Sequence, residues 1–200
     1  MGTTMLRWRQ MDSWSEAAPD RKLSYDDFVR FPDDGLRHEL IDGVHYVTPA
    51  PRIIHERVVG RLFAALYNHL ELNQAGEAFG SRVDVVLSLY DVVEPDVLVV
   101  LADQQKILTE ENVRGAPAIV VEVLSAGTSR RDRDIKRVLY DRAGVREYWM
   151  VDPVRATVVR CVRNEAGALV NRAPLRRSSG ATLTSDLLPG FALALEKLFA

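Results

Sequence analysis

The chain has 200 residues, of which 47% are apolar, and a formal net charge of −2. This length and composition can bury one sizeable core. The near-neutral charge excludes a protein that holds nucleic acid by overall charge alone, and no apolar run approaches the roughly 20 residues needed to cross a bilayer. Cys161 is the only cysteine, which excludes an internal disulfide and a cysteine-based zinc cluster. With no apolar stretch typical of a secretory signal, these features predict a cytoplasmic protein without membrane contact.

The order of hydrophobic patterns predicts one mixed domain. Residues 1–20 show no period and are expected to form a poorly ordered arm, and residues 21–200 to form a single domain. In the first half we expect a short helix opened by the capping box at 24–27, two strands around the Asp42-Gly43 turn, a helix over 53–72, and strands at 82–87 and 95–101. A loop or short helix over 102–114 should follow, then a strand at 118–124 and a helix over 129–143 ended by Gly144. The last expected elements are a strand at 147–153, a hairpin turning at 164–167, and an apolar C-terminal turn. This order favours an α/β (α+β) fold, a mixed central sheet flanked by helices.

Two acidic residues interrupt runs that should be buried strands. Asp96 lies in Glu-Pro-Asp-Val-Leu-Val-Val-Leu, and Glu122 lies in Ala-Ile-Val-Val-Glu-Val-Leu-Ser. A buried ionised carboxylate costs several kcal/mol unless it is compensated, and a divalent cation is one common compensation. Glu39 is a plausible third carboxylate, and the carbonyl of Val123 could complete an oxygen-rich site for Mg²⁺, with Mn²⁺ as an alternative. Either acid could instead lie solvated at a strand end.

The order of these residues and their neighbours resembles a known superfamily. The motifs that carry the resemblance are His38-Glu39-Leu40-Ile41-Asp42-Gly43, Pro49-Ala50-Pro51 with His55, Glu94-Pro95-Asp96, Val121-Glu122-Val123-Leu124-Ser125, Asp132 with Lys136 and Tyr140, and Gly144–Trp149 through Asp152-Pro153. In this order they resemble the PD-(D/E)XK nucleases, and are most similar to the Uma-two branch of bacterial endonucleases, formerly a domain of unknown function. The likeness covers roughly residues 23–199. It implies a restriction-endonuclease-like fold and Mg²⁺-dependent hydrolysis of DNA, with Asp96 and Glu122 as metal ligands supported by Glu39.

The resemblance departs from the simplest superfamily pattern at the lysine. The position two residues after the second acid holds Leu124, and the resemblance implies that Lys136, in the next helix, takes the lysine's role of orienting water or stabilising charge on the phosphate. Lys136 lies about two turns, or roughly 10 Å of rise, after Ser129, so it could lean back toward the strand end. The alternative is an exposed ion pair between Lys136 and Asp132, four residues earlier.

Several further residues are candidates for contact with DNA. Arg130, Arg131, Arg133 and Arg137 could meet the phosphate backbone, or could form a solvated helix face softened by acidic neighbours. His55 could assist the site, although a partly exposed histidine at a helix start is commoner. Cleavage of both strands of a duplex would favour a two-fold homodimer.

A second function is compatible with the same sequence. The chain could be a non-catalytic member of the fold that binds nucleic acid or a partner protein, and the position of Lys136 discriminates between the two. A zinc hydrolase is disfavoured because the histidines lack ligand spacing, and a serine hydrolase because Ser125 has no evident histidine and acid partners.

Overall fold

A computed structural model describes residues 21–48, 50–80, 82–125 and 130–200, without the side chains of residues 130–132. The expected N-terminal arm lies outside this part, as do the Arg130 and Arg131 side chains expected to contact phosphates. None of the helices in the described ranges combines the length and the apolar character needed to span a bilayer.

The larger of two main sheets has seven strands. Its order is β11 (Leu169–Asn171), β10 (Thr157–Arg163), β9 (Glu147–Asp152), β8 (Ile119–Val123), β6 (Val97–Leu101) and β3 (Gly76–Gly80), with β12 (Leu175–Arg176) also paired to β10. β8 and β9 run parallel, and β6 runs antiparallel to β8, with Val97 opposite Val121. This register places Asp96, which immediately precedes β6, beside Glu122 in β8.

The smaller sheet has five strands. Its order is β2 (Val44–Thr48), β1 (Arg37–Ile41), β5 (Asp91–Val93), β4 (Val85–Ser88) and β7 (Val113–Arg114). β1 and β2 form the expected hairpin, in which Asp42 and Gly43 both have positive φ angles of 54° and 75°. Two consecutive positive φ angles are typical of the type I′ turn, which matches the twist of the flanking strands. β13 (Thr182–Leu183) and β14 (Leu193–Ala194) form a separate pair.

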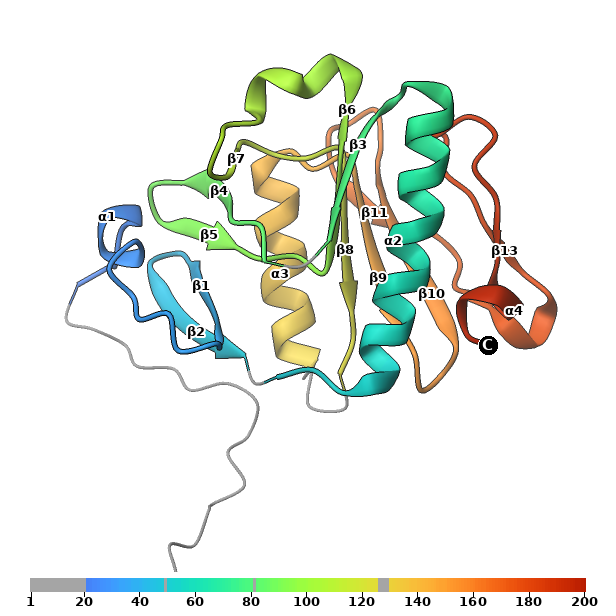
Figure 1. Cartoon of the computed structure of the whole chain (residues 1–200), viewed down its shortest axis with the longest axis horizontal. Helices are drawn as coiled ribbons and strands as arrows, with labels where there is room; N and C mark the ends of the chain where they lie inside the picture. Colours follow the sequence, from blue (N-terminus) through green and yellow to red (C-terminus); the bar gives the residue numbers. More distant parts are fainter. Residues whose placement is uncertain (1–20, 49, 81, 126–129) are drawn as a thin grey trace, which may run out of the picture.

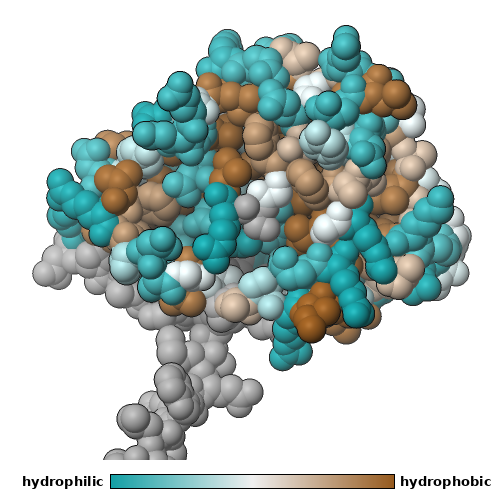
Figure 2. All heavy atoms as spheres, viewed as in Figure 1, coloured by the Kyte–Doolittle hydropathy of each residue, from teal (hydrophilic) through white to brown (hydrophobic). Residues whose placement is uncertain are grey.

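The two long helices cover opposite faces of the seven-stranded sheet (Figure 1). α2 (Ile53–Asn73) packs on the face that carries Val97 and Val99, and α3 (Arg130–Ala143) packs on the face that carries Leu98 and Val100. This alternation is the period of two expected for a strand buried on both sides. The short helices are α1 (Tyr25–Phe28), the 3-10 helices η1 (Ala102–Ile107) and η2 (Arg177–Ser179), and α4 (Leu195–Leu198). Hydrophilic side chains are spread over the face seen in Figure 2, with apolar residues between them.

The α/β fold class and most expected elements are confirmed, with corrections to some strands and to the position of Asp96. β3 and β5 were not expected, and the strand expected at 82–87 begins only at Val85. Asp96 lies immediately before its strand and not inside it. Tyr148 and Trp149, in β9, are 1% and 0% exposed and belong to the core.

Candidate active site

Three buried carboxylates from separate segments of the chain meet on the side of β8 that faces α3. Glu39, Asp96 and Glu122 are 0%, 1% and 8% exposed. Glu39 lies in the middle of β1, which belongs to the five-stranded sheet, whereas Glu122 lies in β8 of the seven-stranded sheet. The acids are therefore gathered at the junction of the two sheets.

Lys136 joins two of these acids. Its Nζ donates hydrogen bonds of 2.9 Å to Glu39 Oε1 and 2.9 Å to Glu122 Oε1. Burial alone would lower the pKa of Lys136, but the charges of Glu122 and Glu39 raise it, so the side chain is an ammonium ion at neutral pH. The structure therefore brings Lys136 to the acids despite its displacement into α3.

Tyr140 lies one helical turn after Lys136, on the same face of α3. Its hydroxyl donates a 2.7 Å hydrogen bond to Glu122 Oε1. Burial raises the pKa of Glu122, because its charged form loses solvent, and Lys136 opposes this shift. Tyr140 and Lys136 together fix the position of the Glu122 carboxylate.

Asp96 is held by groups on three other elements. Its Oδ2 accepts a 2.7 Å hydrogen bond from the backbone N–H of Val123 and lies 3.1 Å from Nε2 of His55, at the start of α2. Its Oδ1 lies 2.9 Å from Arg37 Nη1 in β1. Burial would raise the pKa of Asp96, but the hydrogen bond to His55 and the charge of Arg37 lower it. His55 is thus in contact with the acid cluster, and its pKa is raised because Asp96 outweighs the effect of burial.

Arg37 is the residue of this site that the sequence reasoning missed. Burial would lower its pKa, but the charges of Asp96, Glu39 and Glu122 raise it. Arg37 and Glu39 are two residues apart in one strand, so their side chains leave the same face of the sheet. That spacing was the available signal, because a buried acid in a strand makes its i ± 2 neighbours candidates for the same site.

The donor atoms fit a hard divalent cation, although the cluster is not arranged as a metal cage. Among the described atoms, Glu39 Oε2 is buried and accepts no hydrogen bond, whereas Asp96 Oδ1 is buried and has the Arg37 guanidinium 2.9 Å away. Carboxylate oxygens of this kind are the ligands that Mg²⁺ and Mn²⁺ prefer. Within the described ranges, however, no three side chains of the metal-binding types are close enough to enclose an ion. Arg37 and Lys136 neutralise the acids instead. Val123 contributes its N–H to Asp96, and its carbonyl as a metal ligand stays a prediction.

Arg133 and Arg137, the two predicted phosphate-binding arginines whose side chains are described, do not form an exposed basic patch. Arg137 Nη2 donates a 3.1 Å hydrogen bond to the carbonyl of Leu169, which ties α3 to β11. Arg133, one turn before it, is partly buried. A role for either residue in binding phosphate stays a prediction.

Glu94 is a further acid next to the site. Its backbone N–H donates a 3.0 Å hydrogen bond to Glu39 Oε1. Burial, followed by the charge of Asp84, raises the pKa of Glu94 to about 7. Glu94 therefore gains or loses its negative charge near neutral pH, next to the three acids.

The chain is similar to known proteins of one family and one fold. The family model Uma2, described as "Putative restriction endonuclease", matches residues 25–196. The crystal structure of "a putative nuclease belonging to DUF820" from Anabaena variabilis matches with a TM-score of 0.75 and 16% identity, over 88% of this chain and 97% of that chain. At this identity the likeness establishes the fold alone. No curated protein matches the chain.

Proposed function

Because the chain belongs to the Uma2 family, we propose that it is a metal-dependent nuclease that hydrolyses phosphodiester bonds in DNA. The observation that carries this proposal is the position of Lys136. Its ammonium group donates a 2.9 Å hydrogen bond to each of Glu39 and Glu122. A lysine of α3 therefore contacts acids of β1 and β8.

The proposal gives each residue a role. Asp96 and Glu122 would hold Mg²⁺ or Mn²⁺, with Glu39 in support and the Val123 carbonyl as a further oxygen ligand. When bound, the ion would polarise a phosphoryl oxygen and lower the pKa of a water molecule. Lys136 would orient the attacking water or stabilise negative charge on the phosphate. His55 and Arg37 keep Asp96 ionised, and Tyr140 orients Glu122.

The DNA backbone would be met by basic residues of α3. The proposed contacts are Arg130, Arg131, Arg133 and Arg137. Because one site handles one strand, cleavage of a duplex would use a homodimer with two sites.

The proposal is tested by cleavage of a supercoiled plasmid and of a short single strand. The purified protein is assayed with Mg²⁺, with Mn²⁺ and with chelator, beside Asp96→Asn, Glu122→Gln and Lys136→Met. We expect cleavage in the parent with metal, and loss of cleavage with chelator and in all three variants. Glu110→Gln, which changes an exposed acid in a loop, is the matched control and should cleave like the parent.

Two results would count against this assignment. Cleavage that survives Glu122→Gln would mean a contaminating nuclease or a different site. Cleavage that survives Lys136→Met, with loss in both acid variants, would remove the lysine from the mechanism.

A second candidate function is binding without hydrolysis, and one observation favours it. Arg37 and Lys136 already compensate the acids, and no enclosed metal cage exists among the described side chains. A chain that binds DNA in a gel-shift assay, but cleaves neither substrate with either metal, would support this candidate.

A further inference from the structure

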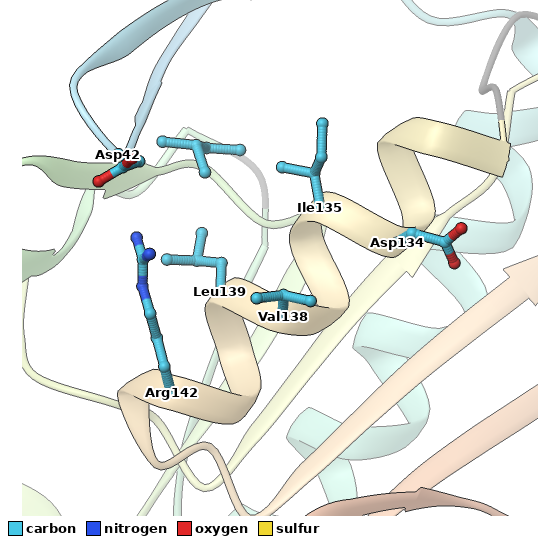
Figure 3. Close-up of a pocket in the computed structure, with 7 residues that line it drawn as sticks. Asp42, Asp134, Ile135, Val138, Leu139 and Arg142 are labelled. Carbon is cyan, nitrogen blue, oxygen red and sulfur yellow. The ribbon is translucent and has the colours of Figure 1, made fainter.

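A separate pocket of about 590 Å³ lies between α3 and the β1–β2 turn (Figure 3). Its lining consists of Ile41, Asp42, Asp134, Ile135, Val138, Leu139 and Arg142. The candidate active site contains Lys136 and Tyr140 of α3, whereas other residues of the same helix line the pocket.

The pocket is apolar inside and carries acids at its margin. Ile41 and Leu139 are buried, while Val138 is 62% exposed. Asp42 and Asp134 are exposed, and Arg142 is engaged in an ion pair with Asp91. Pockets of roughly 300–1,000 Å³ lined mainly by apolar groups are typical of binding sites. This one suits a bulky apolar side chain flanked by positive charge.

The described chain begins at the margin of this pocket. Lys22 Nζ lies 2.5 Å from Asp42 Oδ1, and the N–H of Leu23 donates a 2.9 Å hydrogen bond to the carbonyl of Gly43. The described part of the chain therefore starts next to Asp42, which itself lines the pocket. A segment joined to the chain at that point has a high effective concentration at the pocket.

The N-terminal segment contains a group of matching chemistry. Trp8 lies between Arg7 and Arg9, whereas Trp14 lies between Asp12 and Glu16. Twelve residues lie between Trp8 and Arg21. The 13 steps from one to the other can span up to about 43 Å when extended, so the reach is ample. The acids at the margin of the pocket would attract the arginines beside Trp8 and repel the acidic residues near Trp14.

We propose that this pocket is the docking site of the chain's own Arg7-Trp8-Arg9 segment. The indole of Trp8 packs on Ile135, Val138 and Leu139, one arginine pairs with Asp134, and the other shares Asp42 with Lys22. Docking braces the outer side of α3, whose inner side carries Lys136. The inference does not rest on the nuclease proposal.

Tryptophan fluorescence of the full-length chain tests the docking. In a Trp14→Phe background the remaining tryptophans are Trp8 and Trp149, and Trp149 is fully buried and inaccessible to acrylamide. We expect Trp8 to be protected from acrylamide, and Val138→Asp to increase its quenching several-fold with a red shift. Leu72→Asp, at an 85% exposed position near the end of α2, is the matched control and should leave Trp8 protected. The emission of Trp149 reports whether each variant is folded.

Three outcomes would overturn the proposal. The first is a Trp8 that acrylamide quenches as freely in the parent as in Val138→Asp. The second is protection that grows with protein concentration, which would assign the pocket to a second copy of the chain. The third is protection of Trp14 in the reciprocal Trp8→Phe background, abolished by Val138→Asp, which would assign the pocket to the other tryptophan.

Discussion

Glu39, Asp96 and Glu122 are nearly inaccessible to solvent, and each contacts a cationic side chain. Lys136 serves two of them, and Asp96 has Arg37 and His55. Removing one partner of a buried ion pair leaves an uncompensated charge, which typically costs about 3–5 kcal/mol. The balance of charges is therefore a condition of folding as well as a proposed basis of catalysis.

Replacement of Lys136 tests this balance directly. Lys136→Met keeps the length of the side chain and removes its charge, so we expect the free energy of unfolding at pH 7 to fall by about 3–5 kcal/mol in the absence of metal. The loss should shrink as the pH falls, because the raised pKa of Glu122 lets that acid take up a proton. Urea denaturation at several pH values measures it. Lys106→Met, at an exposed position in η1, is the control, and equal effects of the two changes would contradict the prediction.

Glu94 provides a second test, through the pH dependence of stability. Its pKa is raised to about 7 by burial and by Asp84, so folding favours the protonated acid, and the stability present at pH 4.5 is lost as the pH rises through 7. Glu94→Gln stays neutral and should be more stable than the parent at pH 8 by about 1 kcal/mol, a value reduced for solvent screening. The two proteins should converge in stability below about pH 4.5. Urea midpoints with chelator present measure this, and a constant difference across the pH range would exclude a titrating Glu94.

The sequence pointed to the acids and to Lys136, but not to Arg37, the arginine that pairs with Asp96. Asp96 and Glu122 stood out because each interrupts an apolar run, and the family resemblance pointed to Lys136. Arg37 interrupts no apolar run, and its spacing from Glu39 becomes a signal only once Glu39 is known to be buried. The partners of a buried charge depend on tertiary contacts that local patterns do not carry.

At the scale of elements, α2 and α3 were predictable and β3 was not. The two helices have long periodic patterns and recognisable ends, and α3 ends at Gly144, which has a φ of +89°. β3 reads Gly-Glu-Ala-Phe-Gly, which has too few apolar or β-branched residues to predict a strand. It forms because it pairs along its whole length with the strongly apolar β6.

Gly76 shows how close that pairing is. Its φ is +143°, and a Cβ atom built there would lie 2.7 Å from Leu101 Cα and contact the Val100 carbonyl. We expect Gly76→Ala to lower the free energy of unfolding by about 3 kcal/mol or more, since it combines backbone strain with a clash against backbone. Thermal or urea denaturation measures the loss.

Gly60 is the matched control for Gly76. It lies on the exposed side of α2, and a Cβ atom there has nothing within 4 Å. Gly60→Ala should stabilise the protein by about 1 kcal/mol through helix propensity. Similar effects at the two positions would contradict the close approach of β3 to β6.

At the scale of the whole molecule, the candidate active site joins the two sheets. Glu39 comes from the five-stranded sheet and Glu122 from the seven-stranded sheet, and Lys136 of α3 bonds to both. An ion that used both acids would therefore hold the two sheets together. Binding to the native state alone stabilises a protein, by about 2.7 kcal/mol at a concentration 100 times the dissociation constant.

Metal binding should accordingly be visible without any assay of activity. We expect Mn²⁺ or Mg²⁺ to raise the free energy of unfolding of the parent, and to slow amide hydrogen exchange in β1 and β8 together. β10, on the far side of β9 from β8, should exchange as before. Asp96→Asn should abolish the stabilisation because it removes one proposed ligand, whereas Asp103→Asn, which changes an exposed acid in η1, should retain it. Stabilisation that survives Asp96→Asn would place the ion elsewhere. Protection of β8 without β1 would mean that Glu39 takes no part in holding it.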